Sequence, residues 1–212
     1  MGPFFLNPFY SKFASMSLTQ VCVFCGSRSG HSPNYAQAAR AVSQELAKRN
    51  MGLVFGAGGR GLMGETARAA LACGVPVTGI IPTFLLDQEP PVNNLTELIV
   101  VRDMHERKAK MAEVSDVFVV LPGGIGTLEE ASEILTGNWI GLYHKPIGFL
   151  NINGFYDKLI AFLREAGEAG FMPAACLERV IHDTTVDGLF DKLLAARNDP
   201  IPPLNADCFE RR

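Results

Sequence analysis

"DVFVVLPGGIGTLEEASEILTGNWIGLY", residues 116–143, is the stretch that decides the fold. It begins as an apolar, β-rich run that predicts a strand over 116–124. Three glycines between positions 123 and 126 break this run, and a helical pattern continues over 126–143. A strand, a glycine turn and an amphipathic helix in succession form the repeating unit of a parallel α/β sheet.

The same succession recurs along the whole chain. Ser32 is the predicted N-cap of the first helix, with Pro33 at its first position. Strands are predicted over 21–26, 52–59, 75–82, 97–101, 116–124, 145–151 and 179–183, and helices over 32–50, 62–74, 104–115, 126–143, 154–170 and 185–197. We therefore expect one α/β domain over 20–197, a Rossmann-like three-layer sandwich whose parallel sheet carries helices on both faces. Residues 1–19 and 198–212 lack the pattern and are expected to be irregular extensions.

The composition narrows the classes of partner. The chain is 48% hydrophobic and 19% charged with a net charge of −3, so no basic excess indicates a nucleic-acid partner. No apolar run reaches the roughly 18 residues that a membrane span needs. The five cysteines are odd in number and scattered, which favours a reducing compartment and hence the cytoplasm. Cys22 and Cys25 form a C-x-x-C without a second pair, so we expect no metal.

Ligands of such sheets bind beyond the carboxyl ends of the strands. The loops expected there are 25–30, 56–64, 82–94 and 122–127, and three of them are glycine-rich. Neither G-x-G-x-x-G after the first strand nor a G-x-x-x-x-G-K-[ST] loop is present, which disfavours a classical dinucleotide dehydrogenase and a P-loop NTPase.

Residues 123–127 are the predicted phosphate cradle. Gly123, Gly124 and Gly126 would allow close approach and unusual φ values, and backbone N–H groups would donate at a helix N-terminus together with the Thr127 hydroxyl. The cradle accounts for the glycines, but it leaves unexplained the two glutamates that follow.

Charged residues near two predicted helix starts need a reason. If Thr127 opens its helix, Glu129 and Glu130 fall in the first turn, where either could compensate the helix dipole. Neighbours on a helix point about 100° apart, so only one of them can face a ligand. Arg107 and Lys108 are cations near a helix N-terminus, the unfavourable end, which a ligand or a carboxylate partner would explain.

"PGGIGTLEE", "MHERK" and "GAGGRGLMG", at 122–130, 104–108 and 56–64, together resemble the LONELY GUY family. Its members are cytokinin riboside 5′-monophosphate phosphoribohydrolases, often mislabelled as lysine decarboxylases. The resemblance covers 20–196 and implies hydrolysis of the N-glycosidic bond of N6-substituted adenosine 5′-monophosphates, which yields free base and ribose 5-phosphate. One departure is Ile125, where many relatives carry an aromatic residue.

The resemblance also implies roles for single residues. Glu130 would lie at the ribose as the catalytic carboxylate, paired with a catalytic Arg107 that holds the ribose hydroxyls. Lys108 would be a further ligand contact, and Glu129 a dipole residue or a neighbour of the substrate. The remaining expected substrate contacts are Ser27, Gly58, Gly59, Glu89, Gly123, Gly124, Ile125, Gly126, Thr127, Leu128 and Thr136.

Two of these assignments leave alternatives open. Glu89 is either a contact on the base side or a solvated loop acid. Thr136 is either near the substrate, from across a dimer interface, or a buried hydroxyl bonded to the carbonyl four residues earlier. Lysine decarboxylation would need a pyridoxal Schiff-base lysine in a much larger scaffold, so we expect no cofactor.

Two further alternatives concern function and assembly. The same architecture could bind a nucleotide without cleaving it, as a sensor or carrier, but such a protein has no use for a carboxylate at the anomeric carbon. It could also act on AMP itself. The helix over 126–143 carries more apolar surface than one sheet-facing stripe requires, which predicts a homodimer that buries this helix and the one over 104–115.

Overall fold

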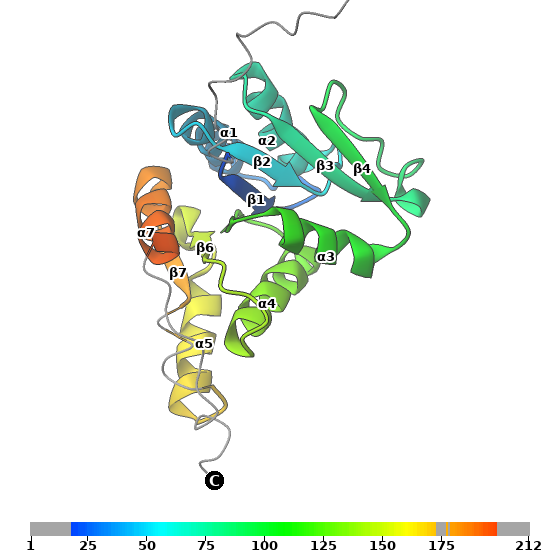
Figure 1. Cartoon of the computed structure of the whole chain (residues 1–212). Helices are drawn as coiled ribbons and strands as arrows, with labels where there is room; N and C mark the ends of the chain where they lie inside the picture. The colour runs from blue at the N-terminus through cyan, green and yellow to red at the C-terminus, as the bar shows by residue number, and fades with distance from the viewer. Residues whose placement is uncertain (1–17, 173–176, 178, 199–212) are drawn as a thin grey trace, which may run out of the picture.

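A computed structural model describes residues 18–172, 177 and 179–198. Within them, one parallel sheet has the strand order β4-β3-β2-β1-β5-β6-β7 (Figure 1). The strands are β1 (Gln20–Phe24), β2 (Gly52–Phe55), β3 (Val77–Pro82), β4 (Glu97–Val101), β5 (Val117–Val120), β6 (Ile147–Leu150) and β7 (Ile181–Asp183). This confirms the expected α/β class. Of the two expected extensions, 1–17 and 199–212 lie outside the described residues, whereas Asn198 ends the last helix.

The helices follow the strands in the predicted alternation. They are α1 (Pro33–Lys48), α2 (Gly61–Ala72), α3 (Met104–Val114), α4 (Ile125–Trp139), α5 (Asp157–Glu168) and α7 (Val186–Asn198). Ser32 caps α1 as predicted, since its side chain accepts a hydrogen bond from the Asn34 amide at 3.3 Å. No helix of the described residues is long and apolar enough to cross a membrane.

Two hydrophobic cores hold the three layers together. On one face of the sheet, α1, α2 and α7 pack on strand residues such as Val21, Leu53 and Val119. On the other face, α3, α4 and α5 pack on the alternate residues, among them Cys22 and Phe118. Side chains of a strand alternate between the two faces of the sheet, and helices cover both faces. The strand sequences are therefore continuous apolar runs.

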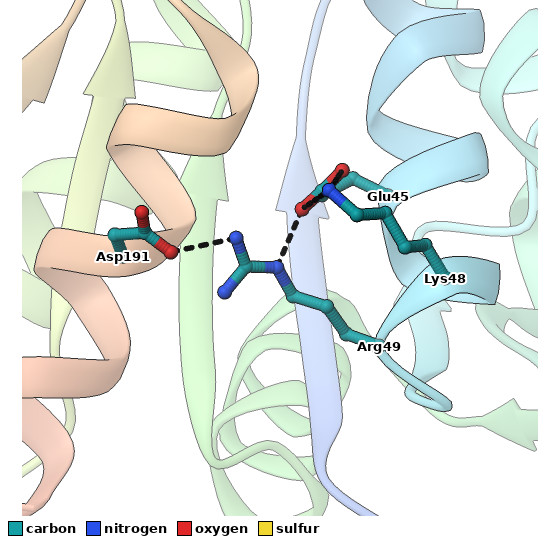
Figure 2. A network of polar contacts seen from close by, with 4 residues as sticks. All are labelled: Glu45, Lys48, Arg49 and Asp191. Atoms are coloured by element: carbon teal, nitrogen blue, oxygen red, sulfur yellow. Dashed lines mark hydrogen bonds and ion pairs between the residues drawn. The ribbon is translucent and has the colours of Figure 1, made fainter.

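A polar network joins α1 and α7 at the edge of the first core (Figure 2). Arg49 follows α1 and donates to Glu45 of α1 at 2.6 Å and to Asp191 of α7 at 2.7 Å. Lys48 also reaches Glu45, at 3.3 Å. The Arg49 guanidinium lies over the Phe190 ring, 5.7 Å from its centroid. The network therefore combines ion pairs with a cation–π contact on a half-buried side chain.

Several element boundaries differ from the prediction, and two of them matter for the site. Helix α4 begins at Ile125 because Gly124 is extended (φ −98°, ψ −154°) and acts as its N-cap. Glu129 and Glu130 consequently lie beyond the first turn, which rules out the alternative that either of them compensates the dipole there. Strand β2 ends at Phe55, and the chain turns at once, with the Gly58 amide bonded to the Gly56 carbonyl at 2.8 Å.

The order of the strands determines where a ligand can bind. β1 lies between β2 and β5, so the loop after β1 leads to α1 on one face and the loop after β5 leads to α4 on the other. The two loops meet where the Gly26 amide donates to the Pro122 carbonyl at 3.1 Å. This is the topological switch point of the sheet, where the crevice of an open α/β fold forms.

Candidate functional site

A cavity of about 630 Å³ opens at this switch point. The loop after β1, the start of α2, the loop after β3, the start of α3 and the loop after β5 all contribute to it, as expected for the carboxyl edge of the sheet. The residues that line it are Cys25–Gly30, Tyr35, Leu62, Met63, Leu85, Glu89, Met104, Arg107, Pro122–Thr127, Glu129, Glu130 and Phe155.

The start of α4 supplies backbone donors to the cavity. The first amide groups of a helix have no partner within the helix and point outward with the positive end of the dipole. A Cβ added at Gly124 or Gly126 would meet nothing within 4 Å, so the backbone is open there. A Cβ at Gly123 would lie 2.6 Å from Cβ of the buried Thr127. Gly123 is therefore required by the packing of Thr127 and not by the ligand.

The three cradle glycines do not have the unusual backbone angles that we expected. The described glycines with positive φ are Gly30, Gly61, Gly74, Gly141, Gly154 and Gly170, and the cradle residues are not among them. The absence of a side chain, which lets the chain pass close to Thr127 and leaves the amides open, accounts for these glycines instead.

Arg107 and Glu130 face each other inside the cavity. Nη2 of Arg107 lies 3.8 Å from Oε1 of Glu130, and the two side chains are only 7% and 13% exposed. Arg107 also donates from Nη2 to the Gly56 carbonyl at 3.3 Å, while its buried Nε has no hydrogen-bond partner among the described residues. This buried donor is therefore unsatisfied among the described residues.

Burial changes the proton affinity of Glu130. It raises the pKa of this carboxyl from 4.5 to about 7, although the Arg107 guanidinium opposes the shift. The nearby carboxylates of Glu129 and Glu133 raise the pKa further, and Lys108 lowers it. A carboxyl whose pKa lies near neutrality, in a cavity beside a buried cation, has the features of an acid–base or charge-stabilising group.

Lys108 is not among the residues that line the cavity. Its ammonium group pairs with Glu129 and, at 2.6 Å, with Glu133, so that it ties α3 to α4. The sequence left two explanations for a cation near the start of α3, a ligand or a carboxylate partner. These carboxylates supply the second explanation for Lys108. A contact of Lys108 with a ligand stays a prediction.

Several other predicted contacts also lie off the cavity. Gly59 lines a separate hollow with Arg60 and Arg68, and its amide bonds to the Pro90 carbonyl at 3.2 Å. The Gly58 amide is likewise bonded within its own turn. Leu128 packs on the second core. Thr136 is exposed, which contradicts the alternative that its hydroxyl is buried.

At the start of α2, two backbone amides already have partners within the protein. The Leu62 and Met63 amides donate to the Gly26 carbonyl at 3.0 and 3.4 Å. The helix start that follows "GAGGRG" therefore supports the loop after β1, and Ser27 of that loop lies on the cavity as predicted.

The fold adds cavity residues that the motifs did not indicate. Tyr35 of α1 and Phe155 meet edge to face, with ring centroids 5.7 Å apart, at one end of the cavity. Leu85 lines it together with Glu89. Their only signal in the sequence was their place at or near predicted carboxyl-edge loops, since no local pattern reveals that a ring turns toward a cavity.

The C-x-x-C cysteines form part of the sheet. Cys22 and Cys25 are buried free thiols, and burial raises the pKa of both well above that of an ordinary cysteine. A thiol held in its neutral form is a weak nucleophile and a weak metal ligand. No group of three or more His, Cys, Asp or Glu side chains in the described parts of the chain could hold a metal ion.

Comparisons with known proteins show to which family the chain belongs. The family model described as "Possible lysine decarboxylase" matches residues 63–193. The cytokinin riboside 5′-monophosphate phosphoribohydrolase LOG3 of Arabidopsis thaliana is 42% identical over 174 residues, which cover 82% of this chain and 81% of the relative. LOG5 of the same plant, with the same described activity, is 47% identical over 153 residues, 72% of this chain and 67% of the relative.

Among solved structures, a molybdenum cofactor binding protein from Rippkaea orientalis matches 85% of this chain and 98% of its own, with a TM-score of 0.66 and 20% identity. At that identity the likeness shows the fold alone. Family model and relatives agree, so the chain belongs to the family of the cytokinin riboside 5′-monophosphate phosphoribohydrolases, which the "Possible lysine decarboxylase" model describes.

Proposed function

We propose that the protein is a phosphoribohydrolase that cleaves the N-glycosidic bond of N6-substituted adenosine 5′-monophosphates. The observation that carries the proposal is the buried pair of Arg107 and Glu130, which shares one cavity with the open start of α4. The relatives' described activity supports the substrate class. The reaction breaks the bond between C1′ and the base, adds the water oxygen to C1′ and returns a proton to the base.

Glu130 is the group that the chemistry requires. Loss of the base builds positive charge on the ribose ring, and a carboxylate beside C1′ stabilises that charge and orients or deprotonates water. The low exposure of Glu130 strengthens this effect, because electrostatic interactions weaken in water. Arg107 favours the ionised form of Glu130, and its guanidinium would hold the ribose hydroxyls.

The start of α4 is the proposed phosphate site. Its amides and the Thr127 hydroxyl would bind the 5′-phosphate, and Glu130 follows on the same helix. A phosphate held there would fix the ribose next to the carboxylate of Glu130. Binding of the phosphate would thus hold the substrate in a reactive orientation. Ser27, Ile125, Glu89 and Leu85 all line the cavity. In this arrangement the first two would border the phosphate, and the last two would border the base.

A decarboxylase function has no support in the cavity. Pyridoxal enzymes hold their cofactor through a lysine, and no lysine is among the described residues that line the cavity. A pure nucleotide carrier would leave the cost of burying Arg107 and Glu130 without a purpose. Incubation of the purified protein with AMP and with isopentenyl-AMP, followed by chromatography of the released base, tests the enzyme and its base preference together.

The phosphate requirement is the first testable prediction. The ribonucleoside without its 5′-phosphate should be cleaved with a kcat/KM at least about a hundredfold lower than the monophosphate, because the cradle supplies binding and alignment. Initial rates of base release for the two substrates at equal concentration measure this. Equal rates would show that residues 123–127 do not bind phosphate.

Assembly and compartment belong to the same proposal. We expect a homodimer, because α4 is followed by two exposed apolar side chains, Ile140 and Leu142. An interface there would lie near Thr136, which is exposed on the same helix and could then reach a partner's substrate. The expected compartment stays the cytoplasm, on the cysteine pattern of the sequence.

A further inference from the structure

Gly56, the first residue after β2, occupies the space next to the Arg107 guanidinium. A Cβ added to Gly56 would fall on Nη2 of Arg107 and would lie 2.8 Å from its Cζ and 3.3 Å from its Nε. The φ of Gly56 is not in the positive range, so an L residue could adopt this backbone. Gly56 is therefore required by the position of Arg107 and not by the turn.

The carbonyl of Gly56 is also held in place. It accepts from the Gly58 amide at 2.8 Å across a three-residue turn whose central residue, the fully buried Ala57, has a φ of 62°. The Ala57 carbonyl in turn accepts from the Val92 amide at 3.2 Å. Turns of this kind are rare and strained, and strain of this kind clusters at functional sites. The turn presents the Gly56 carbonyl to Arg107 at 3.3 Å.

Arg107 has few other restraints at its charged end. Its distance to Glu130, 3.8 Å, is too long for a hydrogen bond, and its Nε has no partner in the described structure. The remaining contact of its guanidinium is a weak one to the Met104 sulfur at 3.6 Å. The Gly56 carbonyl and the missing Gly56 side chain therefore determine how close the guanidinium lies to Glu130.

We propose that Gly56 is a positioning residue, which holds the Arg107 guanidinium beside Glu130 by leaving its space empty and offering its carbonyl. The consequence for the reaction rests on the proposed function. The steric part stands without it, because it concerns only where Arg107 lies. In this proposal the first glycine of "GAGGRG" acts on the site by positioning Arg107. The loop does not act by contacting the ligand.

The variant Gly56→Ala isolates this role. Since the added methyl meets the end of a flexible side chain, the fold should survive while Arg107 moves away from Glu130. We expect kcat to fall at least about thirtyfold with a change in KM of less than about threefold. A loss confined to KM, or activity above half of wild type, would overturn the proposal.

The pH profile gives a readout that a general structural defect would not move. Arg107 favours the ionised form of Glu130, so its displacement should shift the acid limb of the kcat/KM profile to higher pH. The charged and titratable groups around Glu130 are Arg107 and Lys108 from α3, Glu129 and Glu133 from α4, and Cys22 and Cys25 from β1 and the residue after it. The three atoms nearest to a Cβ added at Gly56 all belong to Arg107, so an unshifted limb counts against the proposal.

A double-variant cycle with Arg107→Ala completes the test. Without the guanidinium the added methyl has room, so Gly56→Ala should slow the Arg107→Ala protein less than about twofold further. The same slowing in both backgrounds would show that Gly56 acts elsewhere. The Tm of the same four proteins is also measured by thermal unfolding. Any loss of Tm from Gly56→Ala should be smaller in the Arg107→Ala background than in wild type.

The unfolding arm separates two kinds of failure. If no nucleotide is cleaved but the Tm losses are coupled, the proposed function fails and the contact stands; uncoupled Tm losses in an active enzyme reject the contact. Gly148→Ala is the matched control, because Gly148 is a strand glycine of β6 whose added Cβ would meet Leu189 at 2.7 Å, on the α7 face. It should lower Tm and leave kcat of the folded protein within about twofold.

Discussion

Glu130 combines two properties that oppose each other in an ordinary protein. Its burial disfavours the charged form, and the reaction proposed for it requires that form. Arg107 reduces the conflict without removing it, since the pKa of the carboxyl still lies at about 7. The site therefore sacrifices some stability for a carboxylate that is poorly shielded by water.

Glu130→Gln should keep the fold and lower turnover by at least about a hundredfold, because the amide cannot oppose the developing positive charge. Because the folded state raises the pKa of Glu130, the free energy of unfolding falls as pH rises from 4.5 to about 7. Above that pH the contribution of Glu130 is constant. The variant should therefore be no less stable than wild type at pH 8. Base release and thermal unfolding measure the two effects, and Glu129→Gln, which alters an exposed partner of Lys108, is the control.

The pH dependence of kcat/KM should follow the ionisation of Glu130. Below pH 7 its carboxyl is protonated and cannot stabilise the ribose cation, so the rate should fall about tenfold per pH unit on the acid side. Above pH 7 the rate should reach a plateau. The profile is obtained from rates over a range of substrate concentrations at each pH from 5 to 9. A rate that rises on acidification would instead make Glu130 a general acid.

Pairs of helices are held in register by ion pairs as well as by the cores. Lys108 joins α3 to Glu129 and Glu133 of α4, the helix that carries Glu130. Arg49 joins α1 to α7 through Glu45 and Asp191, at the edge of the sheet opposite the cavity (Figure 2). The two networks thus serve different ends of the molecule.

Arg49→Ala should lower the free energy of unfolding by about 1 kcal/mol, since it removes a half-buried cation shared by two carboxylates and an aromatic ring. Lys48→Ala, at a side chain that is 68% exposed, should change it by only a few tenths of that amount. Urea unfolding compares the two. Activity per folded molecule should be unchanged in both, and an equal effect of the two variants would contradict the role of Arg49.

The apolar surface of the α4 region is smaller than its composition predicts. Ile134 is buried in the second core and Leu135 packs against it, so these residues hold α4 to the sheet. The surplus lies after the helix, where Ile140 and Leu142 are 59% and 66% exposed. This segment, and not the middle of α4, is the stronger candidate for the centre of a dimer interface.

The double variant Ile140→Glu/Leu142→Glu should convert a homodimer into a monomer, because two carboxylates buried in an apolar interface remain unpaired. Light scattering at micromolar concentration measures the mass. Activity should fall with dimerisation if Thr136 acts on a partner's substrate. Phe162→Glu on α5, where Phe162 is 62% exposed, is the control. A wild-type monomer would reject the dimer, and a hexamer would correct its stoichiometry.

Local pattern was enough for the class of fold and the site of the cavity. Apolar runs of strand length, glycine turns and amphipathic helices alternate, and the loops after parallel strands must meet at one edge of the sheet. Such features depend on neighbours in sequence or on the fold class, so a single chain reveals them. The pairing of Arg107 with Glu130 was implied by the family resemblance that "MHERK" and "PGGIGTLEE" carry, and the structure brings the two side chains together.

Packing between distant segments decided the rest. Whether Lys108 faces the cavity or Glu133, and whether Tyr35 reaches Phe155, depends on how helices sit on the sheet, which periodicity does not encode. The glycines of 56–59 look alike in the sequence, yet only Gly56 lies against Arg107, 51 residues away. The space around a residue is a property of the assembled core, where atoms from remote parts of the chain compete for the same volume.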